Sequence, residues 1–252
     1  MKRAALILLA ILALAAWLRV RHLGELGLVV DEGYQALAVR GILAHGVPKV
    51  DSGRLYTRGL PFLYVEAAVA KVRGLDEVAL RLPSAVFGVA AVAMAAVLAY
   101  TLGGWTVGWL TALVMGLSVW EIELSRYARF YTAFQGLYLL ALWCFYRGFL
   151  EGRRPHRIGF WFTAVAAMAM HELGVMLATC FLIPLASSTV SKARKWACVA
   201  GAGGVVALWA LYFKLLAPLQ ALGDTPPLLV EEPGGSGGVL AWFAGMLKTY
   251  LI

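Results

Sequence analysis

Four groups of ionisable side chains in this predominantly apolar chain of 252 residues are candidates for chemistry. In the first group, Asp31 and Glu32 are adjacent. A carboxylate there can act as a general base on an acceptor hydroxyl or bind a divalent cation. Alternatively, Asp31 caps the N-terminus of the helix that follows it. Spacing alone leaves the catalytic and the capping role open.

The second group carries an aromatic hydroxyl and a guanidinium, Tyr56 and Arg58. Arginine can hold a phosphate through bidentate, charge-assisted hydrogen bonds, and tyrosine can add another. The alternative is that both side chains touch lipid headgroups at a membrane interface. Arg81, at the outer end of the second predicted span, can likewise bind a lipid phosphate or pair with an acid at the membrane edge.

A third group contains Arg126 and Arg129, which share one face if this segment is helical. Two guanidinium groups so placed suit a lipid that carries phosphate or pyrophosphate. The alternative is that they pair with Glu121 or Glu123.

His171 and Glu172 form the fourth group and interrupt an apolar run over 158–186. Ionisable groups submerged at membrane depth normally line a cavity, so a substrate or a metal ion can bind there. The alternative is a structural histidine at a helix end. The chain has no P-loop, paired CxxC, HExxH or GxSxG motif, which removes support for the common soluble-enzyme chemistries.

The composition indicates an integral membrane protein, because 62% of the residues are hydrophobic and only 14% are charged. The net charge of +8 arises from three short basic regions, at residues 2–3, 147–157 and 192–195. Placing all three in the cytoplasm satisfies the positive-inside rule. The positive charge therefore indicates topology, and we expect membrane lipids rather than nucleic acid as partners.

The hydrophobic pattern predicts an all-α fold of seven to eight transmembrane helices with a cytoplasmic N-terminus. Residues 21–81 are too charged to cross and form the first extracytoplasmic loop, with one amphipathic helix after Asp31 and another from Pro61 to Gly74. Gly103 and Gly104 make a tight turn. The predicted spans are about 4–20, 82–102, 105–120, 131–147, two short segments that meet at residues 171–172, and 196–216, with a further apolar stretch after 238.

We predict two short spans that meet at residues 171–172, because one long helix would place one of the flanking basic clusters on the extracytoplasmic side. The first of them has about thirteen apolar residues, roughly 20 Å of helix against a core of about 30 Å. His171 and Glu172 are therefore expected below the outer interface. Cys144, Cys180 and Cys198 all lie in apolar runs, so we interpret them as small buried side chains.

We have two further expectations, which concern the two ends of the chain. Residues 1–18 resemble a signal peptide, but an uncleaved first span in the inner membrane is favoured, since the rest of the chain is expected to be membrane-embedded and Trp17 and Arg19 make a suitable interfacial edge. The chain forms one transmembrane domain, 1–252, with an outer loop at 217–238. It stops within an apolar stretch, so we expect it to be incomplete at its C-terminus.

Together these positions resemble the GT-C class of membrane glycosyltransferases. The closest likeness is to the family of protein O-mannosyltransferases and the lipid A aminoarabinose transferase, and it covers about residues 4–215. The order and spacing of the motifs make the likeness specific. They are Asp31-Glu32-Gly33-Tyr34, Gly46 with Pro48, Tyr56 to Pro61, Ala79 to Ser84, Ser125 to Arg129, and His171-Glu172.

The resemblance implies a sugar donor linked to polyprenyl or dolichyl phosphate, used on the extracytoplasmic face. It implies that Asp31, supported by Glu32, deprotonates an acceptor hydroxyl on a lipid, glycan or protein, with inversion at the sugar. Tyr56 and Arg58 match the positions that hold the lipid phosphate. Thr57 departs from the family, because the aminoarabinose enzyme has a metal-binding glutamate there, so the metal is left open.

Two other classes of function remain compatible with these residues. A transporter or flippase for a lipid-linked sugar would use the same basic residues but needs no carboxylate base. Members of the resembled family are longer than this chain, so an inactive, truncated membrane subunit is the third hypothesis.

Overall fold

The computed structural model describes residues 2–186 and 191–221, and in this part of the chain all extended secondary-structure elements are helices, without any strand. An isolated β-bridge joins Lys49 and Leu55 in a loop. The predicted all-α fold is therefore confirmed for these residues. The elements are α1 (Lys2–Val20), α2 (Val30–His45), α3 (Leu60–Arg73), α4 (Glu77–Leu117), α5 (Val119–Ser125), α6 (Tyr131–Phe145), the π-helix η1 (Tyr146–Leu150), α7 (Arg154–Met170), the 3-10 helix η2 (Glu172–Phe181), α8 (Leu182–Ala186) and α9 (Lys192–Ala221).

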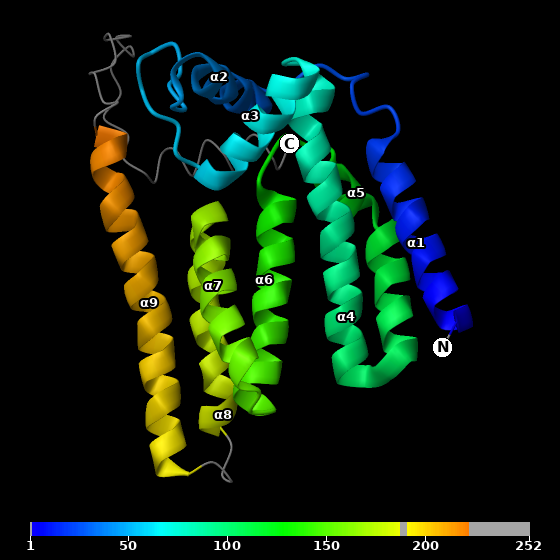
Figure 1. The fold of residues 1–252 in the computed structure, drawn as a ribbon, viewed down its shortest axis with the longest axis vertical. Coiled ribbons are helices and arrows are strands. Elements are labelled where there is room, and N and C mark those ends of the chain that lie inside the picture. Colours follow the sequence, from blue (N-terminus) through cyan, green and yellow to red (C-terminus); the bar gives the residue numbers. More distant parts are fainter. Residues whose placement is uncertain (1, 187–190, 222–252) are drawn as a thin grey trace, which may run out of the picture.

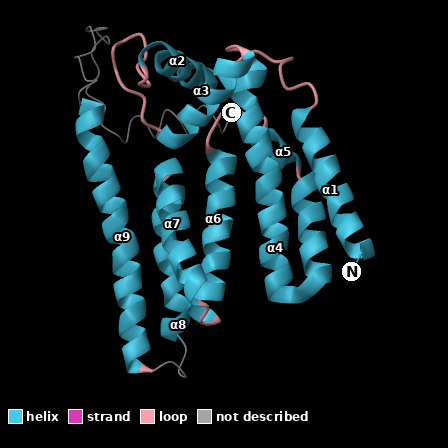
Figure 2. Ribbon diagram, viewed as in Figure 1, coloured by secondary structure: helices cyan, strands magenta, loops and turns pink. Residues whose placement is uncertain are grey.

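The long helices stand side by side, and α2 and α3 lie across one end of them (Figure 1). The start of α1, the connection between α6 and α7, and the start of α9 all lie at the opposite end. Within the described residues, the two longest loops lie on either side of α2, between α1 and α2 and between α2 and α3 (Figure 2). The three basic regions of the sequence therefore lie at one end of the molecule, and the long polar segment lies at the other.

Helix α4 is a hairpin rather than one rod. Gly104 has φ 80°, a conformation that glycine adopts without a steric penalty, and the chain reverses there. The two arms then approach closely, because a Cβ on Gly108 would lie only 3.0 Å from the Tyr100 side chain. The predicted turn at Gly103 and Gly104 is therefore confirmed, although the first arm begins at Glu77 instead of residue 82.

A second reversal occurs at His171, whose backbone is extended (φ −153°, ψ 140°) between α7 and η2. The two segments pack closely, since a Cβ on Gly174 would lie 2.8 Å from the backbone of Met168. The predicted break in the apolar run is therefore confirmed. The segment after the break is a 3-10 helix, which rises about 2.0 Å per residue and so extends further than an α-helix of equal length.

Two described helices, Glu77–Leu117 and Lys195–Leu216, are long and apolar enough to cross a membrane. Ala5–Val20 and Glu172–Leu185 are apolar but shorter. These features favour an association with the membrane. Helix α9 continues to Ala221, so the outer loop expected from 217 begins later, and its remainder, like the apolar stretch after 238, lies outside the described residues.

Helices α6, α7 and α9 pack with η2 around a cluster of phenylalanines. The rings of Phe145 and Phe181 meet edge to face at 4.9 Å, and Phe160 meets both at 5.6–5.7 Å. Such contacts add to the free energy gained from burying the rings. Cys144, Cys180 and Cys198 are buried and free, and all three belong to this cluster, as the sequence predicted.

A buried arginine joins the N-terminal helix to the hairpin. Arg19 is fully buried, and its guanidinium donates to the carbonyl of Gly116 (3.0 Å) and to Ser125 Oγ (3.1 Å). A weaker hydrogen bond reaches the carbonyl of Met115 at 3.4 Å. The last carbonyls of a helix have no partner within it, so Arg19 satisfies the end of α4.

Replacing Arg19 by alanine should lower the free energy of unfolding by about 2–4 kcal/mol, because it leaves carbonyls unpaired and opens a cavity. Arg21→Ala is the matched control, since Arg21 is exposed and stacks on Trp17; its effect should stay within about 0.5 kcal/mol. Thermal and urea unfolding in detergent micelles measure both. Equal stability of the two variants would contradict the role of Arg19.

Candidate functional site

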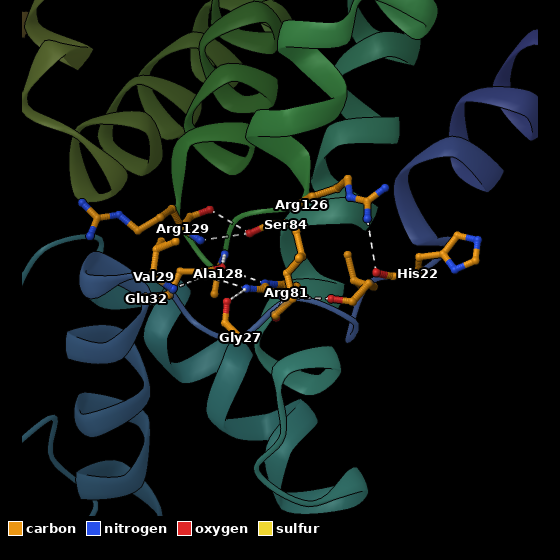
Figure 3. A network of polar contacts seen from close by, with 11 residues as sticks. His22, Gly27, Val29, Glu32, Arg81, Ser84, Arg126, Ala128 and Arg129 are labelled. Carbon is orange, nitrogen blue, oxygen red and sulfur yellow. Dashed lines mark hydrogen bonds and ion pairs between the residues drawn. The ribbon is translucent and has the colours of Figure 1, made fainter.

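Glu32 and Arg81 form a buried, bidentate ion pair between α2 and α4. Arg81 Nε donates to Glu32 Oε1 at 2.8 Å, and Arg81 Nη2 donates to Glu32 Oε2 at 2.7 Å (Figure 3). The Glu32 side chain is fully buried and that of Arg81 is 6% exposed. Two parallel N–H···O bonds fix both the distance and the orientation of the partners.

The same two side chains hold three further segments. Glu32 also accepts from the backbone N–H of Val29 at the start of α2 and of Ala128 at 2.7 Å. Burial raises the pKa of Glu32, but the hydrogen bonds from Arg81 and from these backbone groups outweigh it and leave the pKa lowered. Arg81 donates in addition to three carbonyls, those of Leu23, Leu26 and Gly27.

This arrangement separates the roles of the adjacent acids. Glu32 supplies the carboxylate at the N-terminus of α2, so the capping role considered for Asp31 belongs to Glu32. Glu32 is occupied by four hydrogen bonds, and each nitrogen of the Arg81 guanidinium has an acceptor. Both residues therefore position the site, and neither offers an unused group to a phosphate.

Arg126 and Arg129 point away from each other (Figure 3). Helix α5 ends at Ser125, so the prediction that the two arginines share a helix face is wrong. Arg126 donates to the carbonyl of His22 at 3.2 Å, on the side of α1. Ser84 Oγ donates to the carbonyl of Arg129 at 2.8 Å and thereby fixes this residue against α4.

Arg129 lines a pocket of about 330 Å³ together with residues from distant parts of the sequence. The pocket has a polar side, where the loop before α3 meets the segment before α6, and an apolar side formed by α7 and α9. Its lining residues are Thr57, Arg58, Gly59, Arg129, Phe130, Tyr131, Met168, Ala169, Met170, His171, Glu172, Tyr212, Phe213 and Leu216.

The Arg129 guanidinium is buried but weakly compensated. Its Nη atoms reach the hydroxyl groups of Tyr56 at 3.3 Å and Tyr131 at 3.2 Å, and its Nε has no hydrogen-bond partner among the described residues. The rings of Phe130 and Tyr131 each lie 5.3 Å from its central carbon. A buried donor without a partner is rare, and it leaves the positive charge of this guanidinium incompletely compensated within the described part of the chain.

Asp31 lies at the edge of this arrangement. Its side chain is 69% exposed, and Oδ2 lies 3.5 Å from Arg129 Nη1. Arg129 Nη1 also lies 3.4 Å from the Asp31 carbonyl. The carboxylate is thus held near the arginine without being buried by it, and its free face can accept a proton from a bound molecule.

The loop before α3 places Arg58 on the lining of the same pocket as Arg129. Gly59 adopts φ 59°, and a Cβ there would lie 2.2 Å from the Phe130 ring, so only glycine lets the loop approach. Burial raises the pKa of Tyr56, although the charges of Arg129 and Arg58 oppose it. Tyr56 therefore keeps its hydroxyl proton and can donate a hydrogen bond.

His171 closes the pocket at the chain reversal. Its ring packs against Phe134 at 5.2 Å and Phe130 at 5.8 Å, and its Nδ1 accepts from the backbone N–H of Leu173 at 3.1 Å. Accepting at Nδ1 leaves the proton of a neutral imidazole on Nε2. Glu172, the first residue of η2, also lines the pocket.

In the described ranges, no three His, Cys, Asp or Glu side chains come close enough to hold a metal ion. The divalent cation considered from the sequence therefore has no matching ligand set there. Sequence reasoning missed the wall formed by Tyr131, Tyr212 and Phe213, as well as a buried pair beside the site, Gln35 and Glu66. A polar residue on the buried face of an amphipathic helix was the only available signal for that pair.

Replacing Glu32 by glutamine should lower the free energy of unfolding by about 3–5 kcal/mol at pH 7, because Arg81 is left as an unpaired buried charge. The pKa of Glu32 is lower in the folded state than in the unfolded state, so its ionised carboxylate stabilises the fold at pH values above the ordinary glutamate pKa of about 4.3. This stabilisation is lost as the pH falls through the folded pKa. The wild type should therefore lose more stability than Glu32→Gln below about pH 4.3. Unfolding at several pH values measures this.

Glu25→Gln is the control, since Glu25 is an exposed acid that pairs with His22. It should change stability by less than about 0.5 kcal/mol and keep the pH profile of the wild type. A Glu32→Gln variant as stable as this control would contradict the role of the buried pair.

The comparisons with known proteins leave the site to be judged on its geometry. The chain matches no protein-family model, no curated protein and no solved structure at a significant level. The features available for a functional assignment are an under-compensated buried guanidinium, a second arginine on the lining of the same pocket, and an exposed carboxylate beside the first. This combination fits a site for an anionic ligand with a general base at its edge.

Proposed function

We propose that this chain is a membrane glycosyltransferase. It moves a sugar from a polyprenyl- or dolichyl-phosphate donor to an acceptor hydroxyl on the extracytoplasmic side. The observation that carries the proposal is Arg129, a buried guanidinium with an unpartnered Nε that lines a pocket beside the exposed Asp31 carboxylate. The motif resemblance supports the same activity.

The donor phosphate fits the polar side of the pocket. Arg129, Arg58 and Tyr131 line it, and the hydroxyl groups of Tyr131 and Tyr56 both adjoin the Arg129 guanidinium. Phosphate oxygens prefer such charge-assisted hydrogen bonds. Met168, Met170 and Leu216 form an apolar wall next to it, which suits the hydrocarbon chain of a lipid phosphate.

The chemistry follows from the position of Asp31. Its carboxylate takes the proton of the acceptor hydroxyl, whose oxygen then forms a bond with the anomeric carbon of the sugar. The bond between that carbon and the phosphate oxygen breaks, and its electron pair leaves on the phosphate. Arg129 and Arg58 stabilise the negative charge that develops there. A single displacement inverts the configuration of the sugar.

We propose that the helices form seven to eight transmembrane spans in the inner membrane, with α2 and α3 amphipathic on its extracytoplasmic side. The hairpin at Gly104 and the reversal at His171 support this topology, because they divide the apolar sequence into antiparallel segments. The basic regions support a cytoplasmic N-terminus, since the α1 start, the α6–α7 connection and the α9 start lie at one end (Figure 1).

The direct test incubates the purified protein in nanodiscs with a panel of polyprenyl-phosphate sugars and hydroxyl acceptors. Release of polyprenyl phosphate together with a new glycoside is the expected result. Movement of the lipid-linked sugar across sealed vesicles without a glycoside product would overturn the transferase proposal in favour of a transporter.

Asp31→Asn should lower kcat by about 10²–10⁴-fold, because the amide cannot accept the acceptor proton. Donor affinity should change less than threefold, since the side chain lies at the pocket edge. Asp51→Asn is the matched control, an exposed acid in the same polar segment that pairs with Arg40. Steady-state transfer and donor titration separate the two effects, and full turnover by Asp31→Asn would exclude it as the base.

Arg129→Gln should weaken donor binding by about 10–100-fold, and Arg58→Ala should weaken it by about tenfold, because each removes a charge-assisted hydrogen bond to phosphate. Arg54→Ala, an exposed arginine earlier in the same loop, serves as control. Calorimetric titration with farnesyl phosphate gives the dissociation constants. Unchanged affinity in both Arg129→Gln and Arg58→Ala would contradict the assigned phosphate site.

A further inference from the structure

Gln35 of α2 and Glu66 of α3 form a polar pair that the proposed reaction does not use. Both side chains are fully buried, and Gln35 Nε2 donates to Glu66 Oε2 at 2.9 Å. The remaining oxygen of each, Gln35 Oε1 and Glu66 Oε1, has no hydrogen-bond partner in the part of the chain that the structure describes. Two buried acceptors without a donor, in one pair, require a physical explanation.

A single proton resolves this imbalance. An ionised glutamate can only accept hydrogen bonds, so it offers nothing to the amide oxygen of Gln35. A protonated Glu66 carries one donor and one acceptor, and the primary amide of Gln35 likewise offers both kinds of group. The neutral acid and the amide are therefore complementary, whereas the carboxylate and the amide are not.

The charges around the pair act in opposite senses, so burial is the main factor. Arg129 favours the ionised form of Glu66, while Glu32 on α2, which keeps its negative charge through Arg81, favours the neutral form. Burial raises the pKa of Glu66 well above its ordinary value, and the proximity of Glu32 adds to this; Gln35 and Arg129 lower it by less. Burial in an apolar cluster between α2, α3 and α4 thus favours the neutral acid.

We propose that Glu66 is a neutral carboxylic acid, fully buried against the Gln35 amide with one unpartnered oxygen on each group, and that it is a positioning residue for the anion site, acting through Arg129. This inference rests on the proposed role of Arg129 in binding phosphate. A second ionised acid beside Arg129 would cancel part of its positive charge across a low-dielectric interior. The neutral pair ties α2 to α3 and leaves the charge of Arg129 available to the ligand.

Infrared difference spectroscopy tests the protonation state independently of any ligand. The spectrum of the wild type at pH 7.5, minus that of Glu66→Gln, should contain the carbonyl stretch of a protonated carboxylic acid. Its absence, with carboxylate bands in its place, would overturn the proposal. Glu66→Gln keeps the size of the side chain and its hydrogen bond with Gln35, so it is expected to fold.

Binding of farnesyl phosphate at pH 7.5 then tests the effect on the site. Glu66→Gln should bind it within about threefold of the wild type, because a neutral group replaces a neutral group. Gln35→Glu places two acids together and should weaken binding by about tenfold, since one of them ionises near Arg129. The exchange variant, Gln35→Glu with Glu66→Gln, restores one acid and one amide and should recover the affinity of the wild type.

The two proposals fail in different ways. Glu66→Gln binding more than tenfold tighter than the wild type would show that Glu66 is ionised and would overturn this inference alone. Weak binding by the exchange variant as well as by Gln35→Glu would overturn the positioning role. If the wild type does not bind farnesyl phosphate, the proposed function fails together with the effect on affinity, while the infrared band still decides the protonation of Glu66.

Discussion

The buried ion pair between Glu32 and Arg81 is the constraint on which the rest of the site depends. Removing two charges from water is costly unless each is fully hydrogen-bonded, and here every nitrogen and oxygen of the pair has a partner. Those partners come from the loop after α1, from α2, from α4 and from the segment before α6. Segments separated by about a hundred residues are thereby held together, with Ala128 and hence Arg129 in place.

Arg81 and Arg129 are similarly buried, but the protein compensates their positive charges to different extents. Arg81 is paired with a carboxylate and three carbonyls, so its charge is used within the protein. Arg129 is equally buried but meets two tyrosine hydroxyls at 3.2–3.3 Å, two aromatic rings and an exposed carboxylate at 3.5 Å. Its remaining charge is directed at a pocket, which is why an anionic ligand is the simplest account of it.

The adjacent acids Asp31 and Glu32 have different environments, because side chains at neighbouring positions on a helix point in directions about 100° apart. Glu32 therefore faces the interior and fixes the architecture, while Asp31 faces outward and remains beside Arg129. A third acid, Glu66, lies deeper and has an amide as its partner. In our proposal these three carboxyl groups, with three environments, supply a structural anion, a base and a neutral acid.

The sequence by itself determined most of the helices, the reversals at Gly104 and His171, and the side chains that are capable of chemistry. These features depend on the local spacing of apolar residues, on glycine and on charge, all of which can be seen along the chain. It predicted Asp31, Arg58, Arg129 and His171 as candidates, and the last three line one pocket. Only the tertiary structure decided that Glu32 and Arg81 neutralise each other, that Arg126 turns toward α1, and that Gln35 meets Glu66. Those outcomes depend on which distant segment supplies the partner, and spacing along the chain does not encode that choice.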